Sequence, residues 1–190
     1  MRHLVVFTGV LVLCLTAAPA ATVVVPTEFR EVVADAGLIV RGHVTDVRSV
    51  VVTGLGIETV ATVAVDEVLK GDAADFVSIW VPGGEVGRTR SLMIGAPKLT
   101  VGETAVFFLK RGADSAWRPI GLTMGVYPVY ADPQTRRALV NPPVVADQTA
   151  ASGPVQRGDT RRQPMALADF ESLVRVVMAG QPASASRGRR

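Results

Sequence analysis

Few residues of this sequence are placed to do acid–base or nucleophilic chemistry, and His43 is the first of them. A Ser-His-Asp arrangement would have to use His43, with Asp46 or another acid to orient its ring. The alternation of the surrounding residues puts His43 on the same side of a strand as Arg41 and Thr45, away from the apolar side chains. We therefore expect an exposed strand histidine, and one histidine alone gives no transition-metal site of ordinary ligand count.

Neighbouring carboxylates are the next candidates, because paired acids can act as general acid and general base. The closest pairs are Asp66 with Glu67 and Asp72 with Asp75, on either side of a turn at 69–71. Acids beside a turn are usually solvated, so we predict that these four side chains are not catalytic. The spacing of a calcium-binding loop, D-x-[DN]-x-[DN]-G, does not occur in the sequence.

A glycine-rich stretch at 82–87 (PGGEVG) follows a predicted strand. A phosphate-binding loop would need Lys followed by Ser or Thr after its last glycine, and this sequence has neither there. We therefore predict a long connection between strands. Arg88 and Arg90 follow directly, and the loop 82–98 is where we expect a partner to bind.

The N-terminus has the three parts of a secretory signal peptide. A basic start at 1–3 precedes the 12-residue apolar stretch 4–15, and Ala18-x-Ala20 is the small-residue pattern that predicts cleavage after Ala20. Twelve residues span about 18 Å as a helix, which is less than the ~30 Å hydrocarbon core of a membrane. We predict a signal peptide at 1–20, export to the periplasm or the extracellular space, and no stable membrane insertion after cleavage.

The single cysteine, Cys14, lies in this predicted signal peptide. The mature chain would then contain no cysteine, which excludes thiol catalysis, cysteine-ligated metals and disulfides. We predict no cofactor, no metal and no catalytic residue.

The composition predicts one folded domain of nearly neutral charge. The chain has 190 residues, of which 48% are apolar and 19% charged, so it is not a disordered chain. The formal net charge is +3, but Arg187, Arg189 and Arg190 lie in the last four residues. The body of the chain therefore has no basic excess, and we do not expect a nucleic-acid partner.

Apolar periodicity predicts a helix at each end of the folded part and strands between them. The predicted elements are a helix at 27–34, strands at 38–45, 57–70, 76–82 and 102–110, one or two strands in 117–129, and a C-terminal helix at 165–180. The stretch 141–164 is predicted to be a linker, and 181–190 a disordered tail. Strands at this spacing without intervening helices predict an antiparallel sheet or small barrel in a domain at 27–140.

Four segments of this pattern resemble a known family: 36–45 (AGLIVRGHVT), 62–71 (TVAVDEVLKG), 101–109 (VGETAVFFL) and 121–129 (GLTMGVYPV). Over residues 36–129 the chain resembles netrin-like domains and the tissue inhibitors of metalloproteinases, and also uncharacterised exported bacterial proteins with this pattern. The resemblance implies a mainly β fold, a small antiparallel OB-like barrel. In that family, inhibition depends on a disulfide-bonded N-terminal cysteine that chelates zinc. A mature chain without cysteine cannot use that chemistry, so the resemblance implies a fold and no functional residue.

Phe76 and Trp80 share one side of the third predicted strand. We expect the C-terminal helix to cover this apolar pair, because its own apolar stripe needs a partner. The alternative is that Trp80 is exposed and forms a stacking platform for a sugar or bases.

These observations favour an exported, non-catalytic binding or protein-interaction module. Its partner would be a protein or a glycan of the cell envelope, and the residues we expect to contact it are Arg41, His43, Trp80, Arg88 and Arg90. Two alternatives stay open: an envelope hydrolase that uses surface carboxylates or His43, and a structural subunit whose apolar outer face binds other copies in an oligomer.

Overall fold

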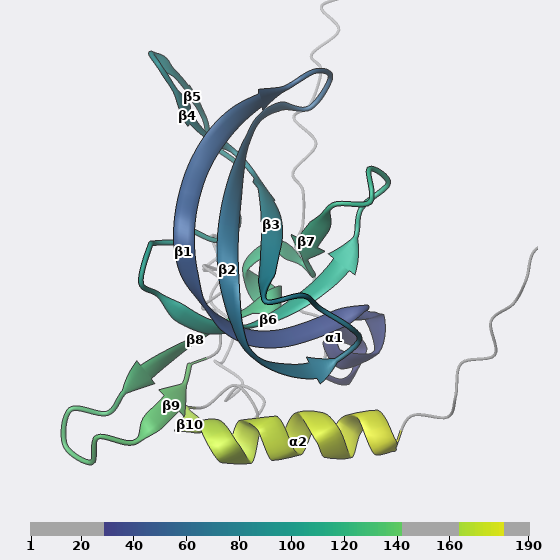
Figure 1. The fold of residues 1–190 in the computed structure, drawn as a ribbon, viewed down its shortest axis with the longest axis vertical. Helices are drawn as coiled ribbons and strands as arrows, with labels where there is room; N and C mark the ends of the chain where they lie inside the picture. Colours follow the sequence, from purple (N-terminus) through teal and green to yellow (C-terminus); the bar gives the residue numbers. More distant parts are fainter. Residues whose placement is uncertain (1–28, 142–163, 181–190) are drawn as a thin grey trace, which may run out of the picture.

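The computed structural model describes residues 29–141 and 164–180, which form a mainly β fold with one α-helix near each end (Figure 1). The mainly β class predicted from the sequence is confirmed. In chain order the elements are α1 (Phe29–Asp35), β1 (Leu38–Val52), β2 (Gly56–Lys70), β3 (Phe76–Pro82), β4 (Gly84–Val86), β5 (Thr89–Ser91), β6 (Thr104–Arg111), β7 (Trp117–Pro119), the 3-10 turn η1 (Leu122–Gly125), β8 (Val126–Ala131), β9 (Ala138–Val140), β10 (Met165–Ala166) and α2 (Leu167–Ala179).

Eight of the described strands form one sheet in the order β1-β2-β3-β7-β6-β8-β9-β10, and β4 pairs with β5 in a separate hairpin. The long strand β1 pairs with β2 over most of its length, and its first six residues also pair with β6. All these pairs are antiparallel except β3 with β7, which are parallel where Ile79 lies opposite Trp117. The two long strands β1 and β2 therefore form the frame on which the other strands are placed.

Strand β1 is bent where its register with β2 shifts. Three shifts occur, between Ile39 and Val40, between Arg41 and Gly42, and between Val44 and Asp46. Irregularities of this kind bend a strand and increase its twist. At the second shift, a Cβ atom on Gly42 would lie 2.3 Å from the carbonyl oxygen of Ala64, so only glycine fits there.

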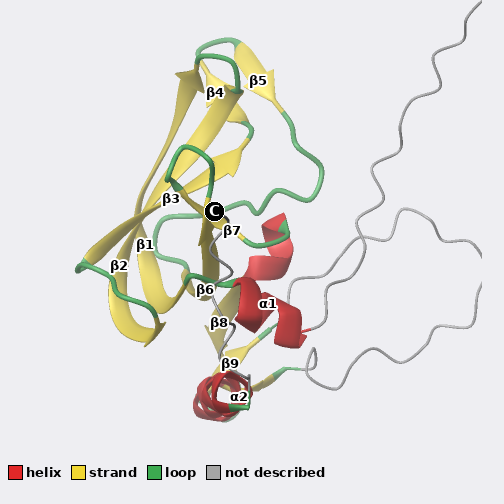
Figure 2. Cartoon of the chain, turned by 90° about the vertical axis from the view of Figure 1, so that its right-hand side faces the viewer, coloured by secondary structure: helices red, strands yellow, loops and turns green. Residues whose placement is uncertain are grey.

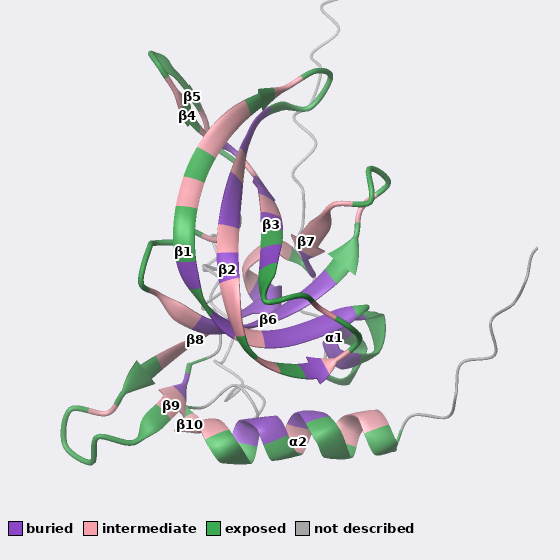
Figure 3. Cartoon of the chain, viewed as in Figure 1, coloured by how far each residue is buried: buried purple, intermediate pink, exposed green. Residues whose placement is uncertain are grey.

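Two apolar clusters lie on opposite faces of the sheet. Alternation along β1 sends Leu38 and Val40 to one cluster and Ile39 to the other. The first cluster includes residues of β2, β3 and β6 and contains no residue of either helix, whereas the second includes the buried side chains of α1 and α2. Figure 3 shows the resulting bands of buried residues along the central strands.

Helix α2 packs on three aromatic rings of other elements, not on the third strand as we predicted from the sequence. Its Phe170 is 1% exposed, and its ring centroid lies 5.0 Å from that of Tyr127, 5.6 Å from Phe29 and 6.2 Å from Phe108. Phe76 remains 61% exposed. In Figure 2, α2 lies below the sheet next to α1 and β9, away from the upper part of β3.

The strands differ from the predicted ranges in several places: β9 was not predicted, and β10 occupies the first two residues of the helix predicted at 165–180. Strand β1 continues to Val52 where we expected its end at 45, and the predicted connection 82–98 contains the β4–β5 hairpin. The predicted signal peptide at 1–20, nearly all of the predicted linker at 141–164 and the predicted tail at 181–190 lie outside the described residues. No helix among the described residues has the length and apolarity needed to span a membrane.

Candidate functional site

A charged cluster joins β1, β2 and α2, and Arg41 is at its centre. The Arg41 guanidinium donates from Nε to Glu171 Oε1 at 2.9 Å and from Nη2 to Glu67 Oε2 at 3.0 Å. Its Nη1 lies 3.6 Å from Asp66 Oδ2. Burial lowers the pKa of Arg41, but its hydrogen bonds and charge interactions with Glu67 and Glu171 outweigh that effect, and the net shift is upward.

Two further side chains complete this cluster. His43 Nδ1 lies 3.2 Å from Asp66 Oδ1, and Arg175 of α2 donates a hydrogen bond to Glu67 Oε1. Asp72 and Asp75 are exposed, as we predicted for acids beside the turn, and Asp66 is exposed too, but Asp66 and Glu67 are paired with arginine. The latter two lie within strand β2 and bind basic side chains of β1 and α2.

The charged cluster has the geometry of a structural connection. Each of its three carboxylates is held by an arginine, and the hydrogen bond of His43 goes to an acid. Glu171 is only 8% exposed, so its pairing with Arg41 compensates a carboxylate that α2 has taken out of water. The cluster fixes α2 against the sheet, and Arg41, one of the residues expected to contact a partner, is used inside the molecule.

A second ion pair links β2 with β7, and the sequence pattern gave no sign of it. Glu58 is 4% exposed and accepts two hydrogen bonds from Arg118, at 2.6 and 3.0 Å. Arg118 also donates to Asp114 at 2.7 Å, and this hydrogen bond is the main reason why the pKa of Asp114 is lowered. Because all three groups satisfy one another, this cluster is a connection between strands and offers no reactive group.

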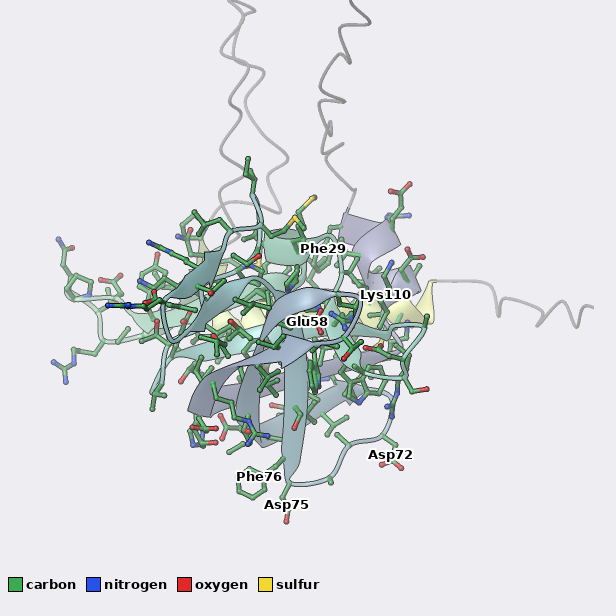
Figure 4. All side chains as sticks on the ribbon, turned by 90° about the horizontal axis from the view of Figure 1, so that it is seen from above. Phe29, Glu58, Asp72, Asp75, Phe76 and Lys110 are labelled. Atoms are coloured by element: carbon green, nitrogen blue, oxygen red, sulfur yellow. The ribbon has the colours of Figure 1, made fainter. Side chains whose placement is uncertain are left out.

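The outer side of β3 presents its two aromatic residues differently. Phe76 lies directly opposite Ala64 on β2, and His43 lies opposite Ala64 on the other side. Phe76 projects from the surface at the lower edge of Figure 4. Trp80 lies opposite the buried Val60 and is itself half-buried. The structure therefore places His43 and Phe76 in one row across the sheet. Trp80 lies four residues further along β3.

The segment 88–94 (RTRSLMI), which we call the basic–apolar segment, is the most exposed apolar stretch of the described residues. It begins in the turn of the β4–β5 hairpin, which extends from the upper part of the molecule in Figure 1. Leu92 is 77% exposed, Met93 53% and Ile94 79%, and Arg88 and Arg90 are also exposed. Three consecutive aliphatic residues in contact with water are unusual for a monomeric surface.

The base of the hairpin is fixed to the inner side of β1 and β2. The Thr59 hydroxyl donates to the carbonyl of Gly83 at 2.8 Å, and the backbone N–H of Glu85 donates to Ser49 Oγ at 3.2 Å. Gly84 has φ 139°, and a Cβ atom there would lie 2.4 Å from Ser49 Oγ. Glycine at this position therefore lets the hairpin lie against the two strands.

The apolar end of the segment is also held by backbone hydrogen bonds. The N–H of Ala96 donates to the carbonyl of Met93 at 3.1 Å, which closes a turn with Ile94 and Gly95 at its centre. Gly95 has φ 81°, the left-handed conformation that such a turn needs at its third residue. The carbonyl of Gly95 accepts from the N–H of Thr123 at 3.1 Å. These bonds present the aliphatic side chains on an ordered turn.

Neither a metal site among the described residues nor a known protein of similar sequence adds to this description. No group of three or more His, Cys, Asp or Glu side chains that could hold a metal ion occurs in the described part of the chain. Comparison with known proteins finds no family model that matches this chain. It also finds no curated protein of significant sequence similarity.

Proposed function

We propose that this chain is an exported, non-catalytic binding module and that the basic–apolar segment is its binding surface. The observation that carries the proposal is the run Leu92-Met93-Ile94, each residue more than half exposed at the start of an ordered turn. Such a run is costly to leave in water, at roughly 25 cal/mol for each Å² of apolar surface. A partner that covers it recovers that free energy. The aliphatic character favours an apolar partner surface over a glycan, for which aromatic and polar side chains would be expected.

We propose that the scaffold of this module is the OB-like barrel implied by the resemblance to netrin-like domains. Support comes from the strand pairings, which run from β1 through β2, β3, β7 and β6 and return to β1. One side of these strands lines the apolar cluster that contains no helix residue, as the inside of a small barrel would. The β4–β5 hairpin would then lie at one end of the barrel, where loops are free to bind a partner.

The charged cluster supports the non-catalytic part of the proposal. A hydrolase that used His43 as a base would need an acid to orient the ring and a serine within hydrogen-bond reach, and in the part of the chain that the structure describes the hydrogen-bond partner of His43 is the acid Asp66 alone. In the described residues no hydrogen bond joins His43 to a serine, and none joins two carboxyl groups. The envelope hydrolase therefore remains the weaker alternative, and activity that is lost in His43→Ala would be its sign.

Photo-crosslinking in the native envelope tests this proposal. A photoreactive amino acid replaces Leu92 in one variant and Val176 in a control, because Val176 is 68% exposed on α2, away from the hairpin. We expect a discrete cross-linked product, of protein or of lipid, at position 92 and none at position 176. No product at 92, or the same products at both positions, would refute the basic–apolar segment as the binding surface.

A further inference from the structure

We infer that the basic–apolar segment binds the surface of an anionic phospholipid bilayer, in a reversible contact at the headgroup level. The inference rests on the proposed function, which makes this segment the binding surface, and it names the class of ligand. It concerns binding to the interface only and involves no membrane-spanning element.

The aliphatic residues have the form that inserts into lipid. Leu92, Met93 and Ile94 are exposed at the start of a turn, and the segment contains no Trp, Tyr or Phe. Protein interfaces are enriched in aromatic residues at their centre and need a matching pocket on the partner. A bilayer is deformable and accepts protruding aliphatic side chains without a matching pocket. A protruding aliphatic run that needs no matching pocket therefore favours lipid over a protein partner.

The charge around these residues is complementary to an anionic surface. Between positions 83 and 98 the chain has three basic residues, Arg88, Arg90 and Lys98, and one acid, Glu85, a net charge of 3 − 1 = +2. All four are exposed. Within the described residues neither Arg88 nor Arg90 has an ion-pair partner, although Glu85 lies opposite Arg90 in the hairpin. The two guanidinium groups are therefore available to lipid phosphates.

The distance between Arg90 and Leu92 suits the two layers of a membrane interface, the phosphate groups and the acyl chains. Arg90 lies in β5 and Leu92 is the first residue after that strand, so their Cα atoms are at most about 7 Å apart. An interfacial segment buries its apolar side about 5–10 Å below the headgroups. Arg90 can therefore contact a phosphate while Leu92 reaches the acyl chains, and Ile94 on its turn lies one step further along.

A site-specific fluorophore tests the inference. In a Cys14→Ser background, which leaves the chain without cysteine, Ile94→Cys is labelled with an environment-sensitive dye, and Val176→Cys serves as control. The probes are vesicles of phosphatidylglycerol with phosphatidylcholine, vesicles of phosphatidylcholine alone, and soluble inorganic phosphate. We expect a blue-shifted, several-fold brighter emission at position 94 with anionic vesicles only, and no change at position 176. No change at 94 with anionic vesicles, or equal changes at both positions, would overturn the inference.

Charge variants separate lipid from other partners. We expect Arg88→Gln with Arg90→Gln to weaken partition to anionic vesicles by about fivefold for each arginine. The matched pair Arg136→Gln with Arg137→Gln, exposed in the β8–β9 connection, should change it less than twofold. Equal effects of the two pairs would contradict the inference. If the dye at 94 is silent while photo-crosslinking at 92 captures a protein, the lipid inference fails and the proposed binding module stands.

Discussion

Removal of the Phe170 ring should destabilise the protein strongly, because α2 covers the aromatic cluster with this side chain. Phe170 is 1% exposed and has three aromatic neighbours with ring centroids at 5.0 to 6.2 Å. Phe→Ala in a closely packed core typically costs 3–5 kcal/mol, the sum of lost transfer free energy and the cavity that remains. We therefore expect Phe170→Ala to lower the free energy of unfolding by about 4 kcal/mol.

The same substitution at Phe76 is the matched control. Phe76 is 61% exposed, so Phe76→Ala should change the free energy of unfolding by about 0.5 kcal/mol or less. Urea unfolding followed by circular dichroism and by tryptophan fluorescence measures both variants, with the midpoint and slope of each transition compared. If Phe76→Ala costs as much as Phe170→Ala, then α2 lies over β3 in solution and our account of its packing is wrong.

Three further predictions concern the interior and the ion pairs. Arg118→Met should lower the free energy of unfolding by about 3 kcal/mol, because it leaves the buried Glu58 carboxylate without a partner. Adding Glu58→Leu should recover most of that loss in a double-mutant cycle. Additive effects of the two substitutions would contradict this. Gly42→Ala should prevent stable folding or lower the melting temperature by more than 10 °C, since its Cβ would meet the Ala64 carbonyl at 2.3 Å; a wild-type melting curve would refute that close approach. The hydrogen bond from Arg118 lowers the pKa of Asp114, so its contribution to stability is complete above the unfolded pKa of about 3.9 and is lost as the pH falls through the lower folded pKa. Asp114→Asn should therefore reduce the loss of stability on acidification. If the variant loses as much free energy of unfolding at low pH as the wild type does, the ion pair of Asp114 with Arg118 does not stabilise the protein.

Local alternation was enough to predict most of the strands. The alternating residues of 57–70 and 76–82 correspond closely to β2 and β3, and the helices predicted at 27–34 and 165–180 contain most of α1 and α2. These elements are predictable because each exposes one side and buries the other, which leaves a period in the sequence. The β4–β5 hairpin was not predicted, because strands of three residues are too short to show a period.

The position of α2 could not be obtained from such local patterns. Phe76 and Trp80 share one side of a strand, and local patterns therefore predict that they are its apolar partner. Its actual partners, Phe29, Phe108 and Tyr127, come from three separate elements that only the folded sheet brings together.

The ion pairs of the molecule were missed for a related reason. The contact of Arg41 with Glu67 depends on the bulged register between β1 and β2, which no motif specifies. Glu58 and Arg118 are 60 residues apart in the chain. Arg88 and Arg90 were noted from the sequence as partner contacts, but an apolar run such as Leu92-Met93-Ile94 is ordinarily expected to be buried. Its exposure is a property of the folded chain alone.

Hydrogen–deuterium exchange of the protein mixed with native envelope tests the central claim most directly, because it reports on every surface at once. We predict that peptides covering residues 84–96 exchange more slowly in the presence of the envelope. Peptides from the outer side of β1 to β3, including His43, Phe76 and Trp80, should exchange as in the protein alone. Protection confined to that outer side, or protection nowhere, would contradict the assignment of the basic–apolar segment as the binding surface.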